Sequence, residues 1–459
     1  MRFGFRGTRG RGVSACALLL LMFGLSAARC HAQDAAPKLA EYMDALAARG
    51  RFSGAVLVAR DGKVVFKRAY GMANYELGVP NTDETKFRIG SMTKPFTAAA
   101  VMLLQERGKL SIQDSICKYV ADCPVAWQPI TLRHLLSHTS GLAKHDKAAD
   151  YLKTAMMPMT VAQLIEGFRN RPPDFKPGER FDYNNNGYVL LGHVIERASG
   201  QTYEAFMREQ VFAPLGMNDT GYDRHEPVIK GRAAGYVRDG AALLNAAHID
   251  QSQPFSAGAL YSTVGDLLLW DQALYAEKLL PRKVLEEMFT PVAGPYGYGW
   301  FVTRQFNRRL LWHGGGTPGF AANLLRFPDE RVTIIVLSNL ESAPVLRASN
   351  DLAAIVFGEK YEVPRERVAV KLDAKTLEAY RGEYEDRPGR TTAVLVEGGT
   401  LLLKLAGQPD PLPLSAESET RFFHPEQDVQ VEFVKDEAGQ VTQLVLRLNG
   451  REFRARKIK

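Results

Sequence analysis

Residues 91–94 read Ser91-Met92-Thr93-Lys94, so a hydroxyl and a primary amine stand three positions apart. Side chains at i and i+3 are neighbours on one face of an α-helix, so this amine can reach the serine oxygen. That is the layout of a serine nucleophile activated by lysine. Residues 97–104 have a strongly apolar helical pattern, and Pro95 is tolerated only in a helix's first turn. The sequence therefore predicts a helix that begins close to Ser91.

The pattern has low specificity on its own. A second copy occurs as Ser115-Ile116-Cys117-Lys118, and a chain of this length should contain about one such pair by chance. No helical pattern follows the second copy in the sequence, so we interpret it as a surface loop. Catalysis at Ser91 therefore requires companion residues elsewhere in the chain.

The patterns around the predicted Ser91 helix indicate an α+β domain. Two strands joined by an Asp61-Gly62 turn precede the helix, and strand patterns return only after residue 296. We therefore expect an antiparallel sheet built from both ends of the domain, with a helical lobe inserted between them. The strands are expected at 52–59, 64–70, 297–303, 309–313, 321–327 and 332–338, and further helices at 131–137, 161–168, 186–198, 203–210, 264–274 and 343–357.

The character of the chain changes after Gly358. Residues 361–371 form a polar linker, and the remainder consists of short alternating runs, several of them separated by glycine turns. This pattern predicts a small all-β domain, a barrel, over residues 372–459. The domain before the linker is expected to span residues 33–360.

The first 32 residues have the pattern of a secretory signal peptide. A basic segment with four arginines precedes an apolar stretch from Val13 to Leu25, and Cys30-His31-Ala32 is a small-x-small cleavage site. We expect cleavage after Ala32 and an exported protein, periplasmic or secreted. Arg29 stands where a lipoprotein signal would have a small residue, which argues against a lipid anchor.

The net charge of the chain does not favour nucleic acid as a partner. Residues 1–32 contain five of the 58 basic residues and no acidic one, so the rest of the chain has 53 basic and 51 acidic residues. A net charge of +2 gives no reason to expect binding to nucleic acid. No later apolar stretch is long enough to span a membrane.

Cysteine usage favours a local disulfide. Only Cys117 and Cys123 remain once the signal peptide is removed, and they lie close together in a loop-like segment. In an oxidising compartment a bond between them is favoured over two free thiols. Neither has a partner at metal-ligand spacing, and no cofactor is indicated.

Two further motifs supply the groups that an acylating serine needs. Tyr183 and Asn185 form the chain's one Tyr-x-Asn motif, just before the helix predicted at 186–198. The stretch at residues 312–320, which contains His313-Gly314-Gly315-Gly316, ends one predicted strand and begins another. A glycine run there would let a ligand lie against exposed backbone N–H groups.

Ser-x-x-Lys, Tyr-x-Asn and His-Gly-Gly, in this order, resemble the motifs of the class C β-lactamase and penicillin-binding-protein superfamily of serine hydrolases. The segments 87–91, 135–142 and 214–217 are also similar to that family, and the resemblance covers residues 38–358. It implies a β-lactamase/transpeptidase-like fold. The β-rich tail resembles small barrels appended to some members.

The resemblance also implies roles for individual residues. Ser91 would be the nucleophile, Lys94 its activator, and Tyr183 the general base that passes the proton to the leaving group. Asn185 would hold the substrate carbonyl or the Lys94 amine. The backbone N–H groups of Ser91 and Gly316 would form the oxyanion hole, and Gly315 and His313 would line the substrate site.

His313 departs from the family pattern, because the penicillin-recognising members carry Lys-Thr-Gly at this strand. A lysine is a permanent cation for the substrate carboxylate, whereas a histidine is only partly charged near neutral pH. The sequence therefore favours an esterase or a D-amino-acid peptidase of the D,D-carboxypeptidase type. Two other functions remain alternatives: a β-lactamase proper, and a catalytically silent peptidoglycan-binding or sensor protein. His313 has an alternative role as well, as a residue that only orders its loop.

Several residues have ordinary structural interpretations. His134 and His138 are expected to be structural histidines of a helix face, and Trp127, Trp270 and Trp300 to belong to the core or the groove wall. The chain contains no Gly-x-Ser-x-Gly motif, which argues against a conventional Ser-His-Asp hydrolase. The oligomeric state and the role of the β domain stay open.

Overall fold

The computed structural model describes residues 1, 4, 35–144, 154–240, 242–406, 408, 410–425, 427–448 and 451–459. Apart from residues 1 and 4, the predicted signal peptide lies outside these ranges. None of the helices within the described ranges combines the length and the apolar character that crossing a bilayer requires.

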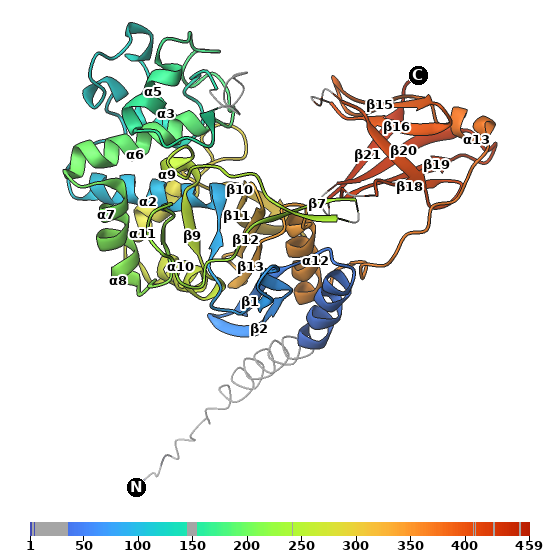
Figure 1. Ribbon diagram of the computed structural model, residues 1–459, viewed down its shortest axis with the longest axis horizontal. Coiled ribbons are helices and arrows are strands. Elements are labelled where there is room, and N and C mark those ends of the chain that lie inside the picture. Colours follow the sequence, from blue (N-terminus) through green and yellow to red (C-terminus); the bar gives the residue numbers. More distant parts are fainter. Residues whose placement is uncertain are drawn as a thin grey trace.

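A six-stranded antiparallel sheet forms the centre of the larger domain (Figure 1). Strand β1 lies between β2 and β13, and Gly54 of β1 pairs with Ser338 of β13. The sheet thus combines strands from the two ends of the domain, as the sequence predicts. The strands, in spatial order, are β10 (Phe301–Gln305), β11 (Arg308–Thr317), β12 (Phe320–Phe327), β13 (Val332–Ser338), β1 (Gly54–Arg60) and β2 (Lys63–Tyr70).

Both faces of the sheet are covered by helices, which explains why β1 is apolar throughout. Ala55 and Leu57 pack into a core with helices α2 (Thr93–Glu106), α6 (Asn185–Ser199) and α10 (Val264–Ala276). Val56 and Val58 point to the opposite face, because successive strand side chains alternate. There they pack with a helix at residues 35–48 and with α12 (Val345–Phe357).

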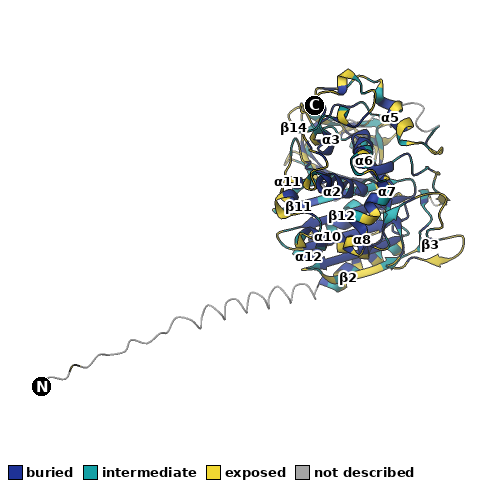
Figure 2. Ribbon diagram, turned by 90° about the vertical axis from the view of Figure 1, so that its left-hand side faces the viewer, coloured by how far each residue is buried: buried dark blue, intermediate teal, exposed yellow. Residues whose placement is uncertain are grey.

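Helices α2 and α6 are largely buried within the larger domain (Figure 2), which also contains shorter helices and strands. They are α3 (Leu132–Leu136), α5 (Val161–Arg169), α7 (Tyr203–Phe206), a π-helical turn at Met207–Phe212, α8 (Ala213–Leu215), α9 (Phe255–Gly258), α11 (Arg282–Met288), β3 (Met72–Asn74), β4 (Val79–Pro80), β5 (Phe87–Arg88), β6 (Gly221–Tyr222), β7 (Tyr236–Asp239), β8 (Ala242–Asn245) and β9 (Leu260–Ser262). The predicted α+β class is confirmed.

Two predicted strands differ from the structure. Residues 297–300 form a turn instead of a strand, because Gly299 has φ +80° and packs so closely on α2 that an added Cβ would lie 2.9 Å from the Lys94 carbonyl oxygen. Strand β11 continues to Thr317, so the strand does not end at His313 as predicted and the glycine run also lies within it. The helices at 35–48 and at α11 have no counterpart in the sequence prediction.

The C-terminal domain is a closed eight-stranded barrel, as predicted, joined to α12 by an extended linker (Figure 1). Its interior holds Tyr380, Tyr384 and Phe433. A short helix, α13 (Ala374–Glu378), precedes the strands β14 (Gly382–Arg387), β15 (Arg390–Glu397), β16 (Thr400–Lys404), β17 (Leu412–Ala416), β18 (Arg421–Phe423), β19 (Val429–Lys435), β20 (Val441–Leu448) and β21 (Arg451–Lys457).

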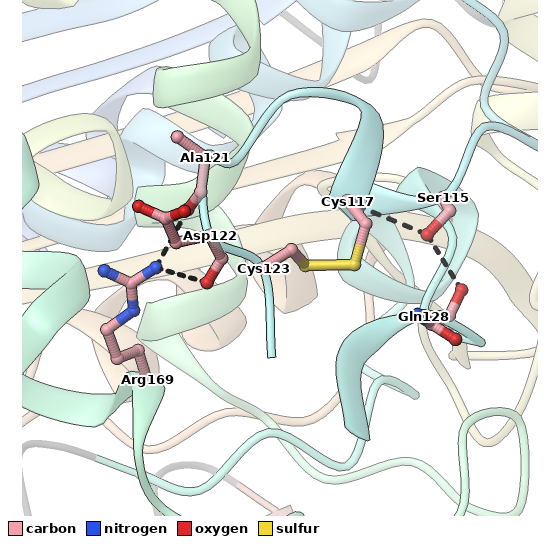
Figure 3. Close-up of a disulfide and its surroundings, with 7 residues drawn as sticks. All are labelled: Ser115, Cys117, Ala121, Asp122, Cys123, Gln128 and Arg169. Carbon is pink, nitrogen blue, oxygen red and sulfur yellow. Dashed lines mark hydrogen bonds between the residues drawn. A yellow bond between two sulfur atoms is a disulfide. The ribbon is translucent and has the colours of Figure 1, made fainter. Parts of the chain in front are cut away.

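The second Ser-x-x-Lys copy lies in a surface loop closed by a disulfide between Cys117 and Cys123 (Figure 3). Residues 116–118 form a short 3₁₀ turn. The Ser115 hydroxyl accepts from the backbone N–H of Cys117 and donates to the Gln128 carbonyl. Lys118 pairs with Asp114 at 2.9 Å. The loop therefore has a structural role.

Arg169 joins this loop to α5. The guanidinium donates to the carbonyls of Ala121 at 2.8 Å and Asp122 at 2.7 Å (Figure 3). The preceding residue, Phe168, stacks on the buried Trp127 with ring centroids 5.7 Å apart. The disulfide loop thereby fixes the end of α5, and α5 forms one wall of the site described next.

Candidate active site

Ser91 and Lys94 meet at the start of α2. Ser91 lies in a single 3₁₀ turn, Gly90–Met92, directly before the helix. The Lys94 Nζ donates to the Ser91 Oγ at 2.9 Å and to the Ala257 carbonyl at 2.8 Å. Lys94 is completely buried, and its amine lies 4.8 Å from the centroid of the Tyr183 ring. The structure thus brings together the three residues that the motifs single out for catalysis.

Glycines allow β11 to pack directly against the turn that carries Ser91. A Cβ on Gly315 would lie 1.9 Å from the Ile89 carbonyl oxygen, and one on Gly90, which has φ +50°, would lie 2.8 Å from the Gly316 nitrogen. A Cβ on Gly316 would meet nothing within 4 Å. Gly315 is therefore needed for packing, while Gly316 faces open space beside Ser91.

Ser91 and Gly316 separate two cavities. The smaller, about 170 Å³, is lined by Asn185 and by apolar side chains of α5 and α6. The larger, about 490 Å³, is lined by Tyr183, His313 and the first turn of α12. A substrate bond held at Ser91 would therefore place its two halves in cavities of different size and composition.

His138 holds the backbone on both sides of Tyr183. The N–H of Asp182 donates to the His138 carbonyl at 2.9 Å, and the N–H of Asn184 donates to its Nδ1 at 3.1 Å. The His138 and Tyr183 rings lie 4.3 Å apart. The predicted structural role of His138 is confirmed, but its predicted place on a helix face is wrong, because His138 lies beyond α3 in the left-handed region, with φ +56°. A left-handed turn at a histidine has no characteristic residue spacing, so the sequence could not predict it.

His313 is buried and neutral. Its Nδ1 can only donate to the Gly314 carbonyl, 2.7 Å away, so its Nε2 accepts from the Tyr296 hydroxyl at 2.9 Å. Burial, with a further contribution from the Lys94 charge, lowers the pKa of His313 to about 3. The expectation of a partly charged histidine is therefore wrong. Among the described residues that line the larger cavity there is no arginine or lysine either.

The buried histidines should make the protein acid-sensitive. The folded-state pKa of His313 lies below the unfolded value, so its contribution to stability is complete above about pH 6.5 and is lost as pH falls toward 3. For this group we expect a loss of about 2 kcal/mol between pH 7 and pH 5. Burial also lowers the pKa of His138, which acts in the same direction.

Chemical unfolding at pH 7 and pH 5 measures this effect. The difference in free energy of unfolding between the two pH values should shrink by about 2 kcal/mol in His313→Asn relative to the unmodified protein. An equal pH dependence in both proteins would show that His313 titrates normally in the folded state.

The other predicted residues are distributed as follows. Asn185 is the first residue of α6 and lines the smaller cavity. Trp127, Trp270 and Trp300 are fully buried and belong to the core. The sequence gives no indication of a role for Tyr296, which is hydrogen-bonded to His313. Within the described ranges, no three His, Cys, Asp or Glu side chains gather as a metal site would require.

Comparison with known proteins agrees with this geometry. The Beta-lactamase family model matches residues 39–358, and a domain of unknown function, DUF3471, matches residues 366–457. Penicillin-binding protein 4* of Bacillus subtilis is 32% identical over 443 residues, covering 88% of this chain and 95% of the relative.

Two solved structures are also similar. The octameric penicillin-binding protein homologue from Pyrococcus abyssi superimposes with a TM-score of 0.66 and 26% identity, over 92% of this chain and 99% of that one. The D-amino acid amidase from Ochrobactrum anthropi SV3 gives 0.58 and 26%, over 65% and 90%. With its fold, its motif order and a family match over residues 39–358, the chain belongs to the Beta-lactamase family of penicillin-binding-protein-like serine hydrolases.

Proposed function

We propose that this chain is an exported serine hydrolase that forms an acyl-enzyme on Ser91 with an ester, amide or peptide substrate. The observation that carries the proposal is the Lys94 amine 2.9 Å from the Ser91 hydroxyl, at the boundary between two cavities. In its neutral form, an amine at this distance can take the hydroxyl proton as the serine attacks a carbonyl carbon, and it becomes an ammonium.

The other groups complete a two-step reaction. The backbone N–H groups of Ser91 and Gly316 stabilise the oxyanion of the tetrahedral intermediate. Tyr183 gives its hydroxyl proton to the nitrogen or oxygen of the leaving group and regains a proton from the neighbouring Lys94 ammonium. The leaving group departs and leaves the acyl group on Ser91. A water molecule, deprotonated by the same groups, then releases the acid and restores the serine. Asn185 orients the acyl half from the smaller cavity.

The residues that line the two cavities indicate which half of the substrate binds in each. Tyr183 lines only the larger cavity, so the leaving group that it protonates lies there. The acyl half then occupies the smaller cavity of about 170 Å³, below the roughly 300 Å³ typical of complete small-molecule sites. We therefore propose a compact acyl residue and a larger, apolar leaving group.

Neutral His313 supports an esterase or D-amino-acid peptidase over a β-lactamase. A penicillin carboxylate in the larger cavity would find no lysine or arginine among the described lining residues. The D-amino acid amidase among the structural neighbours is consistent with amide substrates of this kind. We expect hydrolysis of 4-nitrophenyl acetate and much slower hydrolysis of nitrocefin.

Covalent labelling tests the nucleophile. Intact-mass measurement after a fluorophosphonate should show one adduct on the native protein and none on Ser91→Ala, whereas Ser115→Ala, in the second motif copy, should label fully. Equal labelling of Ser91→Ala would overturn the assignment. Labelling without turnover of any ester or amide would favour the catalytically silent binding protein.

A further inference from the structure

Helix α12 lies on the side of the larger domain nearest the barrel (Figure 1), and its first turn also lines the active site. Residues 343–346 form one wall of the larger cavity. Leu346 packs against β11, since a Cβ added to Gly314 would lie 3.4 Å from the Leu346 Cδ2. The next residue, Arg347, donates to the Asp428 carboxylate at 2.7 Å, and Asp428 lies in the loop between the barrel strands β18 and β19. The cavity wall and the barrel contact are therefore adjacent in the sequence.

The sequence of this turn makes it dependent on a carboxylate from elsewhere. Pro344 precedes the helix and provides no side-chain cap, and the first turn contains no acidic residue. A helix N-terminus carries a partial positive charge, so Arg347 is unfavourable there. Asp351, one turn further on, pairs with the Arg347 Nε at 3.2 Å but also accepts from the Tyr42 hydroxyl at 2.6 Å. Asp428 of the barrel supplies a second carboxylate.

The contact between Arg347 and Asp428 is buried but narrow. Their side chains are only 19% and 10% exposed, so the pair is largely shielded from water. Two cavities between the domains, of about 520 Å³ and 590 Å³, are each lined by both side chains. Apolar packing between the domains is therefore interrupted at the pair. The ion pair, and not an apolar contact, holds the barrel loop to α12 at this point.

The other side of the first turn is held by the core of the larger domain. Val345 and Ala348 are buried among the side chains that cover one face of the sheet. Leu346 and Arg347 are half-buried. Loss of the ion pair should therefore leave α12 folded and release only the side of its first turn that carries these two residues. The larger cavity would then lose a fixed wall.

We propose that Asp428 is a positioning residue for the active site: by pairing with Arg347 it holds the first turn of α12, and with it Leu346, as a wall of the larger cavity. The inference rests on the proposed function, because that function places the leaving group in this cavity. It gives the barrel a role within its own chain, which is to complete the leaving-group site of the larger domain.

Two esters that share an acetyl group test this role. The leaving group of 1-naphthyl acetate is large enough to contact the α12 wall, whereas the methanol of methyl acetate is not. Titration of the released acid at constant pH gives kcat/KM for each. In Asp428→Ala the ratio of the naphthyl to the methyl ester should fall by about 10-fold, because only the large leaving group loses an apolar contact. General destabilisation would lower both rates equally and leave the ratio unchanged.

Two further variants make the test specific. Glu359→Ala is the matched control, because it removes a carboxylate that pairs with Arg308 at 3.1 Å just beyond the other end of α12. This variant should keep the native ratio. Arg347→Met should lower the ratio as much as Asp428→Ala does, and the double variant should fall no further, since both changes break one interaction.

Three results would overturn the inference. The first is a ratio in Asp428→Ala within about threefold of the native one, the second is an equal fall in Glu359→Ala, and the third is a double variant in which the two single effects multiply. If neither ester shows Ser91-dependent hydrolysis, the proposed function fails instead. Hydrogen–deuterium exchange then decides the inference. The backbone N–H groups of residues 345–349 should exchange about 10-fold faster in Asp428→Ala than in the native protein, and equal rates would refute it.

Discussion

Lys94→Met should lower kcat/KM for 4-nitrophenyl esters by about 10³-fold or more, because it removes the base that activates Ser91. The methionine side chain fills nearly the same volume in the buried position between Ala257 and Tyr183. It removes a buried amine without leaving a cavity, which offsets the hydrogen bond lost at the Ala257 carbonyl, so thermal stability should change little. The loss should appear in the acylation step, measured as the rate of fluorophosphonate labelling.

Lys118→Met is the matched control for this experiment, since it alters the lysine of the second motif copy. That change removes only an exposed pair with Asp114, worth at most about 1 kcal/mol. Activity should stay at the native level. A Lys94→Met protein that retained more than about a tenth of native activity would contradict the role assigned to Lys94.

Gly315→Ala should lower kcat by displacing the backbone of β11 beside Ser91. The new Cβ would lie 1.9 Å from the Ile89 carbonyl oxygen, a backbone atom that cannot rotate away. Strand β11 must then retreat from the turn that carries Ser91, and the Gly316 N–H retreats with it. Loss of one oxyanion-hole donor costs about 10²- to 10³-fold in kcat, and we expect a fall of at least this size together with a lower melting temperature.

Gly316→Ala controls for the effect of an added methyl group on stability. Its Cβ would meet nothing within 4 Å, so its melting temperature should remain near the native value. Melting curves and ester kinetics of the two variants provide the comparison. Native activity in Gly315→Ala would show that the close packing of β11 on this turn does not set the oxyanion hole.

The α+β fold and the barrel could be predicted because their signals are local. Apolar periodicity located β13 at 332–338 without error, and glycine turns marked the barrel strands. The spacing of Ser91 and Lys94 encodes a contact within one helical turn. The error at residues 297–300 arose because the alternating Tyr and Gly residues, with Gly299 packed on α2, resemble a strand in sequence alone.

The supporting residues of the site could not be predicted because their roles depend on distant partners. His138 acts through a left-handed turn and through backbone groups more than 40 residues away. The neutral state of His313 follows from burial and from the Tyr296 hydroxyl, neither of which is visible in the motif.

The pairing of β1 with β13 also constrains when the enzyme can become active. Gly54 and Ser338 are neighbours in the sheet, and the Gly316 N–H comes from the same late part of the chain. A growing polypeptide therefore cannot close the sheet or complete the site until more than 330 residues have been made. Pairings this distant also slow folding, since a long loop must close before they form. We therefore expect an N-terminal fragment that stops short of β13 to leave β1 without one of its two neighbouring strands and to show no Ser91-dependent ester hydrolysis.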